Sequence, residues 1–383
     1  MGIEGHLNIR LGTESGSVGM VQINSSRPVH ASSIFHGKEL QEVLNTLPML
    51  FAVCGTAQAC AGVRACEQTL GMMPSPQIEA QRSCLVRMEN LREQLWRILL
   101  EWPGYLDETS DQQSMMLALV LQREHRQIVT DGRNPFLLPG DGHVSEPADM
   151  QGLVSSVAGL LEKVVFGMPA SRWLEITGVP WLEEWSKAGS TLAARTIGFL
   201  IDQGLCELGR CQVESLPNME SELLHELLQD DNFVAHPQWL GSCRETTSCS
   251  RVDSQLMQQL RGRYGNGLLV RLVARLTEIA QLSMDLLPAP SGQECMVEPG
   301  KINNPGIGQV VAARGQLVHR VGLKQGLISS YQILAPTEWN FHPDGLVATA
   351  LATLKGDAAR IERQARLLIN AIDPCVGYEL SIS

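Results

Sequence analysis

Most of the chain carries apolar residues at the spacing of amphipathic helices. Met88, Leu91 and Leu95 recur every three or four positions, which places them on one helical face. The same periodicity predicts five helices, at about residues 83–102, 151–166, 189–205, 266–286 and 357–372. Asp357 begins the last of these and is placed to cap its N-terminus. The centre of the molecule is therefore expected to be largely helical.

Two segments alternate between apolar and polar residues instead, and they predict β-hairpins. One covers residues 5–24, and the other combines GQLVHRVGL and LISSYQILA around a short turn at Gln325. Arg314 and Thr337 lie about equally far from this turn, so we expect them roughly across from one another. The sequence thus predicts an α+β fold that is predominantly helical, with small peripheral hairpins.

The remaining long segments have the composition of surface connections. Residues 103–148 and 287–309 are rich in proline, glycine and acidic residues. We expect them to connect helices on the surface of one body, not to link separate domains. The chain contains no internal repeat, and residues 1–383 are expected to form a single domain.

Composition and charge narrow the class of protein. The chain is 44% hydrophobic and 19% charged, which provides enough apolar material for a sizeable core. Its net charge of -11 offers no general attraction to nucleic acid or to anionic membranes. The first residues lack the positive start and apolar centre of a signal peptide, and no stretch reaches ~18 uninterrupted apolar residues. We expect a cytoplasmic protein whose ten cysteines are reduced.

Several short motifs stand out from the periodic pattern. In chain order they are IEGHLNI, FHGKEL followed by AVCGTAQACAG, then AARG, PTEWNFHP and IDPC. Together they resemble the motifs of nickel-iron hydrogenase large subunits, in that family's order and across residues 3–378. The resemblance covers most of the chain, whereas any one motif alone would be weak. It implies the large-subunit fold, with both chain ends and both hairpins converging on a central pocket.

The cysteines depart from that family's pattern. In catalytic large subunits, two CxxC motifs give four thiolates to nickel, and the second cysteine of each also bridges to an iron that bears two cyanides and one carbonyl. Cys54 and Cys375 match the leading cysteines, but Ala57 and Tyr378 stand where the bridging cysteines belong. Tyr378 would then fill the space of the lost thiolate. With two of four soft ligands missing, neither nickel binding nor hydrogen turnover is expected.

The positions that contact the diatomic ligands of the iron in that family are retained. Arg314 matches the arginine near one cyanide, and Pro336 with Thr337 matches the segment at the other. A buried cyanide nitrogen needs a donor, because an unpaired buried acceptor costs about 1–3 kcal/mol. The resemblance therefore implies that Cys54 and Cys375 ligate iron, with their thiolates stabilised by Arg314 and by a helix N-terminus after Cys54.

Other candidate residues have structural explanations beside functional ones. Cys60 can reach the site from the first turn of a helix as a third ligand, whereas Cys54 and Cys375 can also be buried remnants of an ancestral site. Glu4 matches a glutamate that relays protons in catalytic relatives, and here it either contacts Cys375 or fixes the N-terminal strand. Arg314 can instead pair with a carboxylate. His319, inside the second hairpin, is expected to be structural.

These departures resemble the HupK/HoxV family of large-subunit-like accessory proteins. That resemblance implies a non-catalytic scaffold that carries the Fe(CN)2(CO) unit transiently before its transfer to the catalytic large subunit. Its partners would be the hydrogenase maturation complex, maturation chaperones and the unprocessed large subunit. Two alternatives stay open. One is a metal-free docking protein that recruits chaperones by mimicking the large subunit, and the other is a residual metalloenzyme that uses Cys54, Cys60 and Cys375.

Overall fold

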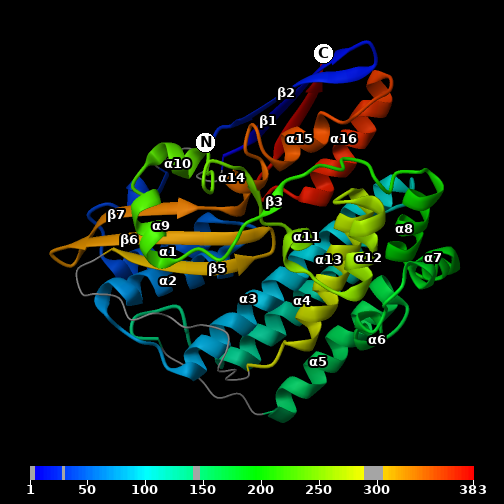
Figure 1. The fold of residues 1–383 in the computed structure, drawn as a ribbon. Helices are drawn as coiled ribbons and strands as arrows, with labels where there is room; N and C mark the ends of the chain where they lie inside the picture. The colour runs from blue at the N-terminus through cyan, green and yellow to red at the C-terminus, as the bar shows by residue number, and fades with distance from the viewer. Residues whose placement is uncertain (1–4, 28–30, 141–146, 289–304) are drawn as a thin grey trace.

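The computed structural model describes residues 5–27, 31–140, 147–288 and 305–383, and most of these are helical (Figure 1). The longer helices are α1 (Leu40–Leu50), α2 (Gly55–Leu70), α3 (Pro76–Trp96), α4 (Gln112–Thr130), α5 (Pro147–Leu161), α7 (Val179–Ala188), α8 (Leu192–Asp202), α12 (Gln255–Tyr264), α13 (Leu268–Met284) and α16 (Ala358–Ile372). The shorter ones are α6 (Ala170–Leu174), α9 (Ser221–Leu227), α10 (Asp231–Ala235), α11 (Ser248–Arg251), α14 (Pro336–Asn340) and α15 (Leu346–Leu351). The strands are β1 (Leu7–Glu14), β2 (Ser17–Ser25), β3 (Glu214–Ser215), β4 (Arg244–Glu245), β5 (Gly306–Ala312), β6 (Gly315–Lys324), β7 (Leu327–Leu334) and β8 (Tyr378–Ile382).

The five helices predicted from apolar periodicity are confirmed as α3, α5, α8, α13 and α16. The Asp357 side chain accepts a hydrogen bond from the Arg360 amide at 2.8 Å, and so it caps α16 as predicted. α13 is buried on nearly every side, which makes it the central helix, and α3 packs beside it (Figure 1). Within the described residues, none of these helices combines the length and apolarity that crossing a bilayer requires.

The connection expected over residues 103–148 contains helix α4, so that expectation is wrong. The buried face of α4 carries Leu121 and Val129 at helical spacing. Its other face exposes Met116 and Val120, at 60% and 41% of their full surface. Apolar residues on both faces weaken the amphipathic pattern, which is why the periodicity of the sequence did not predict this helix.

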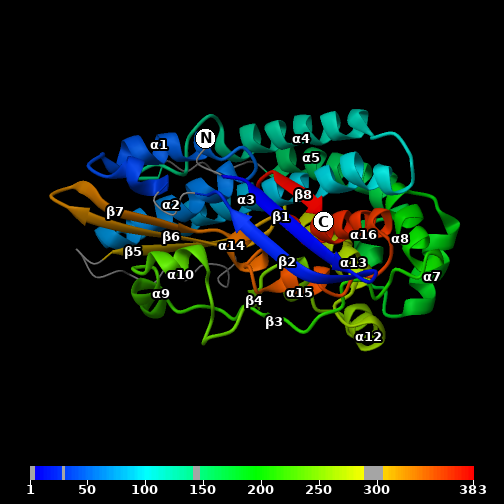
Figure 2. The same ribbon diagram turned by 90° about the horizontal axis from the view of Figure 1, so that it is seen from above.

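The first predicted hairpin is confirmed as β1 and β2, and a third strand joins it. β8 lies parallel to β1, with Leu7 opposite Tyr378, and the strand order is β2-β1-β8. Segments near the two ends of the chain therefore lie side by side in one sheet (Figures 1 and 2). β8 was not predicted, because its five residues have mixed polarity and their pairing partner lies at the other end of the sequence.

The second predicted hairpin is confirmed as β6 and β7, and β5 completes a sheet of order β5-β6-β7. Gln325 and Gly326 form its turn with φ of 56° and 80°, the left-handed conformation of a tight hairpin. β5 begins at Gly306, inside the expected connection 287–309, so that prediction is wrong for its last residues. Residues 289–304 of the same connection lie outside the described residues.

Arg314 and Thr337 lie at the same end of the second hairpin. Arg314 stands in the turn between β5 and β6, and Thr337 stands in α14, directly after β7. The Asn340 side chain of α14 donates a hydrogen bond to the Arg314 carbonyl at 3.1 Å. The hairpin therefore brings together two motifs that are far apart in the sequence, AARG and PTEWNFHP.

Two glycines allow α2 to lie directly on β5. A Cβ atom at Gly308 would lie 1.9 Å from the Ala61 carbonyl oxygen, and one at Gly306 would lie 1.9 Å from that of Ala65. Any larger residue would have to push the helix off the sheet. Because α2 begins directly after Cys54, this contact fixes where Cys54 lies relative to the hairpin.

We expect Gly308→Ala to lower the free energy of unfolding by about 2–3 kcal/mol, because the new methyl group collides with backbone atoms that cannot rotate away. Gly19→Ala, in β2, is the matched control, since a Cβ atom there meets nothing within 4 Å. Urea denaturation of both variants measures the difference. Equal stability of the two variants would contradict the close packing of α2 on β5.

Candidate functional site

Cys54 caps the N-terminus of α2, but the first amides of that helix serve another group. Glu89, from α3, accepts hydrogen bonds from the amides of Thr56 at 2.8 Å and Ala57 at 2.9 Å. These amides carry the partial positive charge of the helix end. The expectation that the helix N-terminus stabilises a Cys54 thiolate is therefore wrong, because a buried carboxylate occupies that position.

The surroundings of Cys54 keep its sulfur protonated. Burial raises the pKa of the Cys54 thiol, and the nearby Cys375 and Glu89 raise it further. A hydrogen bond from Gln58 at 3.5 Å and the charge of Arg314 act in the opposite direction but do not compensate. Cys54 is therefore a neutral thiol in the protein alone.

Gln58 connects Cys54 to a buried histidine in the second hairpin. The Gln58 carbonyl oxygen lies 2.8 Å from Nε2 of His319, and Nδ1 of His319 lies 2.8 Å from the Tyr331 hydroxyl. Since that oxygen can only accept, Nε2 carries the proton and Nδ1 accepts from Tyr331. Burial and the charge of Arg27 lower the pKa of His319 to about 3, so it stays neutral. His319 is thus a hydrogen-bonded structural residue, as predicted.

Cys375 is tied to α14 through Thr337. The Cys375 amide donates to Oγ1 of Thr337 at 3.2 Å, and Sγ of Cys375 lies 2.8 Å from the same oxygen. Because Oγ1 already accepts the amide, its own hydrogen is free to donate to the sulfur. Pro336 is buried beside it at the first position of α14, where a missing N–H costs no helical hydrogen bond. Burial raises the pKa of Cys375, although Arg27 opposes the shift.

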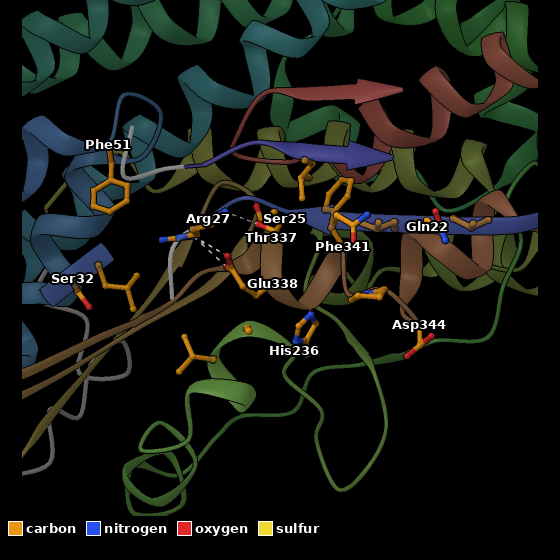
Figure 3. A pocket seen from close by; sticks show the side chains of 18 residues that line it. Gln22, Ser25, Arg27, Ser32, Phe51, His236, Thr337, Glu338, Phe341 and Asp344 are labelled. Atoms are coloured by element: carbon orange, nitrogen blue, oxygen red, sulfur yellow. Dashed lines mark hydrogen bonds and ion pairs between the residues drawn. The ribbon is translucent and has the colours of Figure 1, made fainter. Parts of the chain in front are cut away.

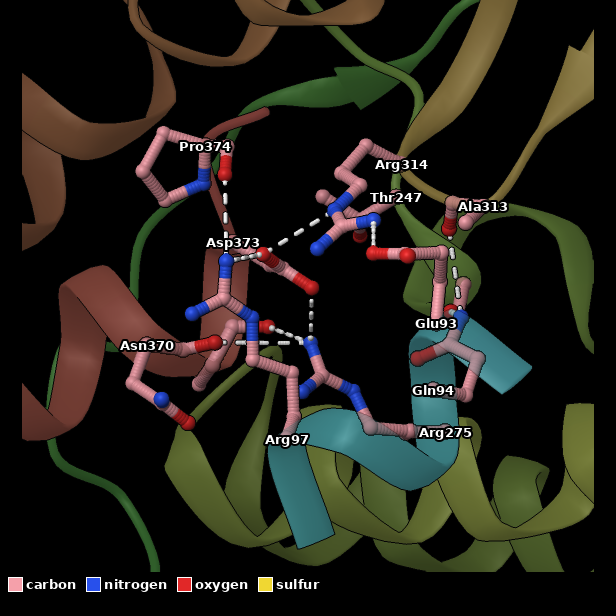
Figure 4. Close-up of polar contacts among 12 residues, drawn as sticks. Glu93, Gln94, Arg97, Thr247, Arg275, Ala313, Arg314, Asn370, Asp373 and Pro374 are labelled. Atoms are coloured by element: carbon pink, nitrogen blue, oxygen red, sulfur yellow. Dashed lines mark hydrogen bonds and ion pairs between the residues drawn. The ribbon is translucent and has the colours of Figure 1, made fainter. Parts of the chain in front are cut away.

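Arg314 is held by two carboxylates and keeps one donor (Figure 4). Its Nη1 bonds to Glu93 of α3, and its Nε lies 3.1 Å from Oδ1 of Asp373. Its Nη2 makes no hydrogen bond to any residue that the structure describes. The alternative interpretation, an ion pair with a carboxylate, is therefore confirmed.

Asp373, directly after α16, is shared among three arginines (Figure 4). Besides Arg314, it pairs with Arg97 at 2.6 Å and with Arg275 at 3.4 Å, and all four side chains are at most 17% exposed. Burial alone would raise the pKa of Asp373, but Arg314, Arg97 and Arg275 outweigh that effect and lower it. A buried carboxylate that belongs to the IDPC motif thus anchors Arg314.

The open space of the site lies beside Thr337 and not beside Arg314. The cavity that Arg314 lines has about 10 Å³, roughly the room that one water molecule needs. A groove of about 530 Å³ is lined by Thr337 together with Arg27, Glu338 and residues of β2 and α10 (Figure 3). Of these two spaces, only the groove has room for a ligand larger than water.

The structure does not place every predicted residue at the site. Cys60 is fully buried in α2, within the apolar cluster against β5 to β7. Among residues 5–27, 31–140, 147–288 and 305–383, no three histidine, cysteine, aspartate or glutamate side chains are grouped closely enough to hold a metal ion. Cys60 is therefore not grouped with Cys54 and Cys375 as a third ligand. Tyr378 begins β8, where it lies opposite Leu7 of β1 in the sheet.

Glu4 lies outside the described residues. Sequence reasoning missed four charged residues around the two cysteines, namely Arg27, Glu89, Glu338 and Asp373. Glu338 and Asp373 stand inside the motifs PTEWNFHP and IDPC, so the sequence already showed a carboxylate in each motif that could form an ion pair. Glu89 stands on the buried face of the predicted helix 83–102, which is the second signal, whereas nothing in the pattern marks Arg27.

Three curated relatives resemble the chain over nearly its whole length. HoxV of Cupriavidus necator is 31% identical, and the match covers 100% of this chain and 96% of HoxV. HupV of Azotobacter chroococcum is 29% identical and HupK of Azotobacter vinelandii 27%, each over 99% of this chain and 98% of the relative. All three are named hydrogenase expression/formation proteins.

The family model of nickel-dependent hydrogenases matches residues 273–376. Solved hydrogenases show the fold of the whole chain. The NiFeSe hydrogenase of Desulfovibrio vulgaris Hildenborough superposes with a TM-score of 0.66 at 16% identity, over 95% of this chain and 94% of that chain. The enzyme of Desulfomicrobium baculatum gives 0.64 at 14% identity, over 95% of each chain. The predicted large-subunit type of α+β fold is confirmed.

Proposed function

Because the chain belongs to the family of hydrogenase expression/formation proteins that includes HoxV, HupV and HupK, we propose that it acts in hydrogenase maturation as a scaffold for the iron unit. In this proposal the protein receives Fe(CN)2(CO), holds it through Cys54 and Cys375, and passes it to an unprocessed large subunit. The maturation complex and its chaperones are the proposed donors, and the protein itself is not a catalyst.

The observation that carries this proposal is the meeting of two thiols from opposite ends of the sequence. Cys54 and Cys375 are close enough for one to raise the pKa of the other, and the charges of Arg314 and Arg27 act on Cys375. Soft thiolates suit iron, and guanidinium and hydroxyl groups such as those of Arg314 and Thr337 suit cyanide nitrogens. To reach a guest, the cavity beside Arg314 has to widen and the Thr337 hydroxyl has to leave Cys375. Two ligands hold a transient guest less firmly than four, which favours release.

The same arrangement argues against a nickel centre. Ala57 stands in the first turn of α2, where its amide bonds to Glu89, and Tyr378 lies opposite Leu7 in the sheet. Neither position presents a thiolate toward Cys54 or Cys375. A tetrathiolate nickel site therefore lacks half of its ligands, and added nickel would not restore them. A residual metalloenzyme would instead show hydrogen-dependent dye reduction and bound nickel.

We expect infrared spectra of the protein, purified anaerobically from a host with its own maturation machinery, to contain cyanide and carbonyl stretching bands. These bands report the intact iron unit directly, because protein groups do not absorb in that region. Metal analysis of the same sample is expected to find iron without nickel. A wild-type spectrum that lacks the bands would overturn the scaffold proposal.

A metal-free docking role is the second candidate, and one observation favours it. Arg314, Arg97 and Arg275 find their counter-charges in Glu93, Glu101 and Asp373 without any ligand. The protein therefore folds around a site that is already balanced, as a mimic of the large subunit would. An infrared spectrum without cyanide and carbonyl bands, together with retained binding of an unprocessed large subunit, would favour this role.

A further inference from the structure

The groove beside Thr337 opens between the N-terminal sheet and the segments that follow β7. Its walls come from β2, from α10, and from the segment that begins with α14 (Figure 3). Arg27, Thr337 and Glu338 lie together, between Phe51 and Ser32 on one side and Gln22 and Asp344 on the other (Figure 3). We call this space the Arg27 groove.

Arg27 presents uncommitted donors to this groove. Its Nη1 donates to both carboxylate oxygens of Glu338, at 3.1 and 3.3 Å. Its Nε and Nη2 make no hydrogen bond to any residue in the described part of the chain, and neither is sealed from solvent. The guanidinium also lies 6.0 Å from the ring centre of Phe51, which limits its motion.

Neither thiol lines the groove, but two of its lining residues interact with them. Thr337, which lines it, bonds to Cys375, and the charge of Arg27 is close enough to lower the pKa of Cys375 and to be affected by Cys54. The cavity at Arg314 is too small for any ligand but water, because Glu93 and Asp373 close around that side chain. Of these two arginines, Arg27 is therefore the one that lies beside a space large enough for a guest.

We propose that the Arg27 groove is the receiving site for an anionic, cyanide-bearing iron complex, in which Arg27 donates to a cyanide nitrogen while Glu338 holds the guanidinium in place. This inference rests on the proposed scaffold function and names the residue that takes up its guest. A guanidinium suits this task because it offers several donors in a plane and stays charged when partly buried. With a net charge of -11, the rest of the molecule repels such a complex, so the local charge matters.

A purely structural role makes a different prediction for the same pair. If Arg27 only tied the N-terminal sheet to α14, Arg27→Gln and Glu338→Gln would break one ion pair and act alike. In a receiving site they act in opposite directions. Arg27→Gln removes the donor, whereas Glu338→Gln removes the competing anion and leaves more of the guanidinium to the guest.

The test is calorimetric titration of the purified protein with hexacyanidoferrate(II). This ion has cyanide nitrogens but no exchangeable position for a thiolate, so it reports the groove without ligation by Cys54 or Cys375. We expect Arg27→Gln to weaken binding at least about tenfold and Glu338→Gln to strengthen it a few-fold. Arg172→Gln, at an exposed position of α6, is the charge-matched control and should bind like wild type.

Equal affinity of Arg27→Gln and wild type, or a change in the same direction for both groove variants, would overturn the inference. Infrared spectra of anaerobically purified wild type and Arg27→Gln separate it from the proposed function. Bands in wild type that are lost or shifted in Arg27→Gln support both statements. Identical bands in the two proteins would support the scaffold function and reject the Arg27 groove as the receiving site. If the wild-type spectrum lacks the bands but the titrations give the expected affinities, only the scaffold function is rejected.

Discussion

Cys54→Ala and Cys375→Ala are each expected to abolish the cyanide and carbonyl infrared bands of the anaerobically purified protein. Within the described residues, no third group stands ready to replace a lost ligand. A single thiolate also loses the chelate effect of two, so the iron unit leaves during purification. Infrared spectra at equal protein concentration, together with iron analysis, measure the loss.

Two other cysteines serve as controls for these variants. Cys211→Ala removes a partly exposed thiol outside the site, and its spectrum should match wild type. Cys60→Ala removes a fully buried thiol of α2, and we expect it to keep the bands as well. Loss of the bands in Cys60→Ala with retained folding would establish a third ligand, and full bands in Cys54→Ala would contradict the two-thiol site.

The parts of the fold that the sequence predicted are those with local causes. The second hairpin follows from alternation around a turn, where Gln325 and Gly326 adopt left-handed conformations. β8 has no such local cause, because Tyr378 pairs with Leu7 at the other end of the chain. α4 was not predicted, because Met116 and Val120 add apolar residues to its exposed face.

The sequence predicted those residues of the candidate site that belong to its recognisable motifs. Cys54, Cys375 and Thr337 followed from the resemblance, and the structure places them together. Their electrostatic surroundings did not follow, because an ion pair such as Arg314 with Glu93 joins residues 221 positions apart. Neither spacing nor composition shows that Glu89 takes the first amides of α2.

Asp373 connects the stability of the site to its charge balance. It is the carboxylate that three buried arginines share, so removing its charge leaves three cations with only Glu93 and Glu101 as counter-charges. Arg97 keeps its ion pair with Glu101, whereas Arg275 keeps only bonds to two backbone oxygens, and these neutral groups cannot balance its charge. Neutralising Asp373 is therefore expected to destabilise the site strongly.

We expect Asp373→Asn to lower the free energy of unfolding by about 3–5 kcal/mol, the usual cost of leaving buried charges without their partner. Asp253→Asn is the matched control. Its carboxylate pairs with Arg261 at 3.3 Å but is 69% exposed, so its loss should change stability by no more than about 0.5 kcal/mol. Urea denaturation at pH 7 compares both variants with wild type.

The pH dependence of this loss distinguishes a charge effect from a packing effect. The three arginines lower the pKa of Asp373 in the folded protein below its ordinary value of about 3.9. A lowered folded pKa gives stability that is fully present above the ordinary value and is lost as the pH falls through the folded one. The difference between wild type and Asp373→Asn should therefore stay constant from pH 8 to 5 and narrow only below about pH 4. A difference that stays constant through that acid range would assign the loss to packing and contradict the role of Asp373 as the shared counter-charge.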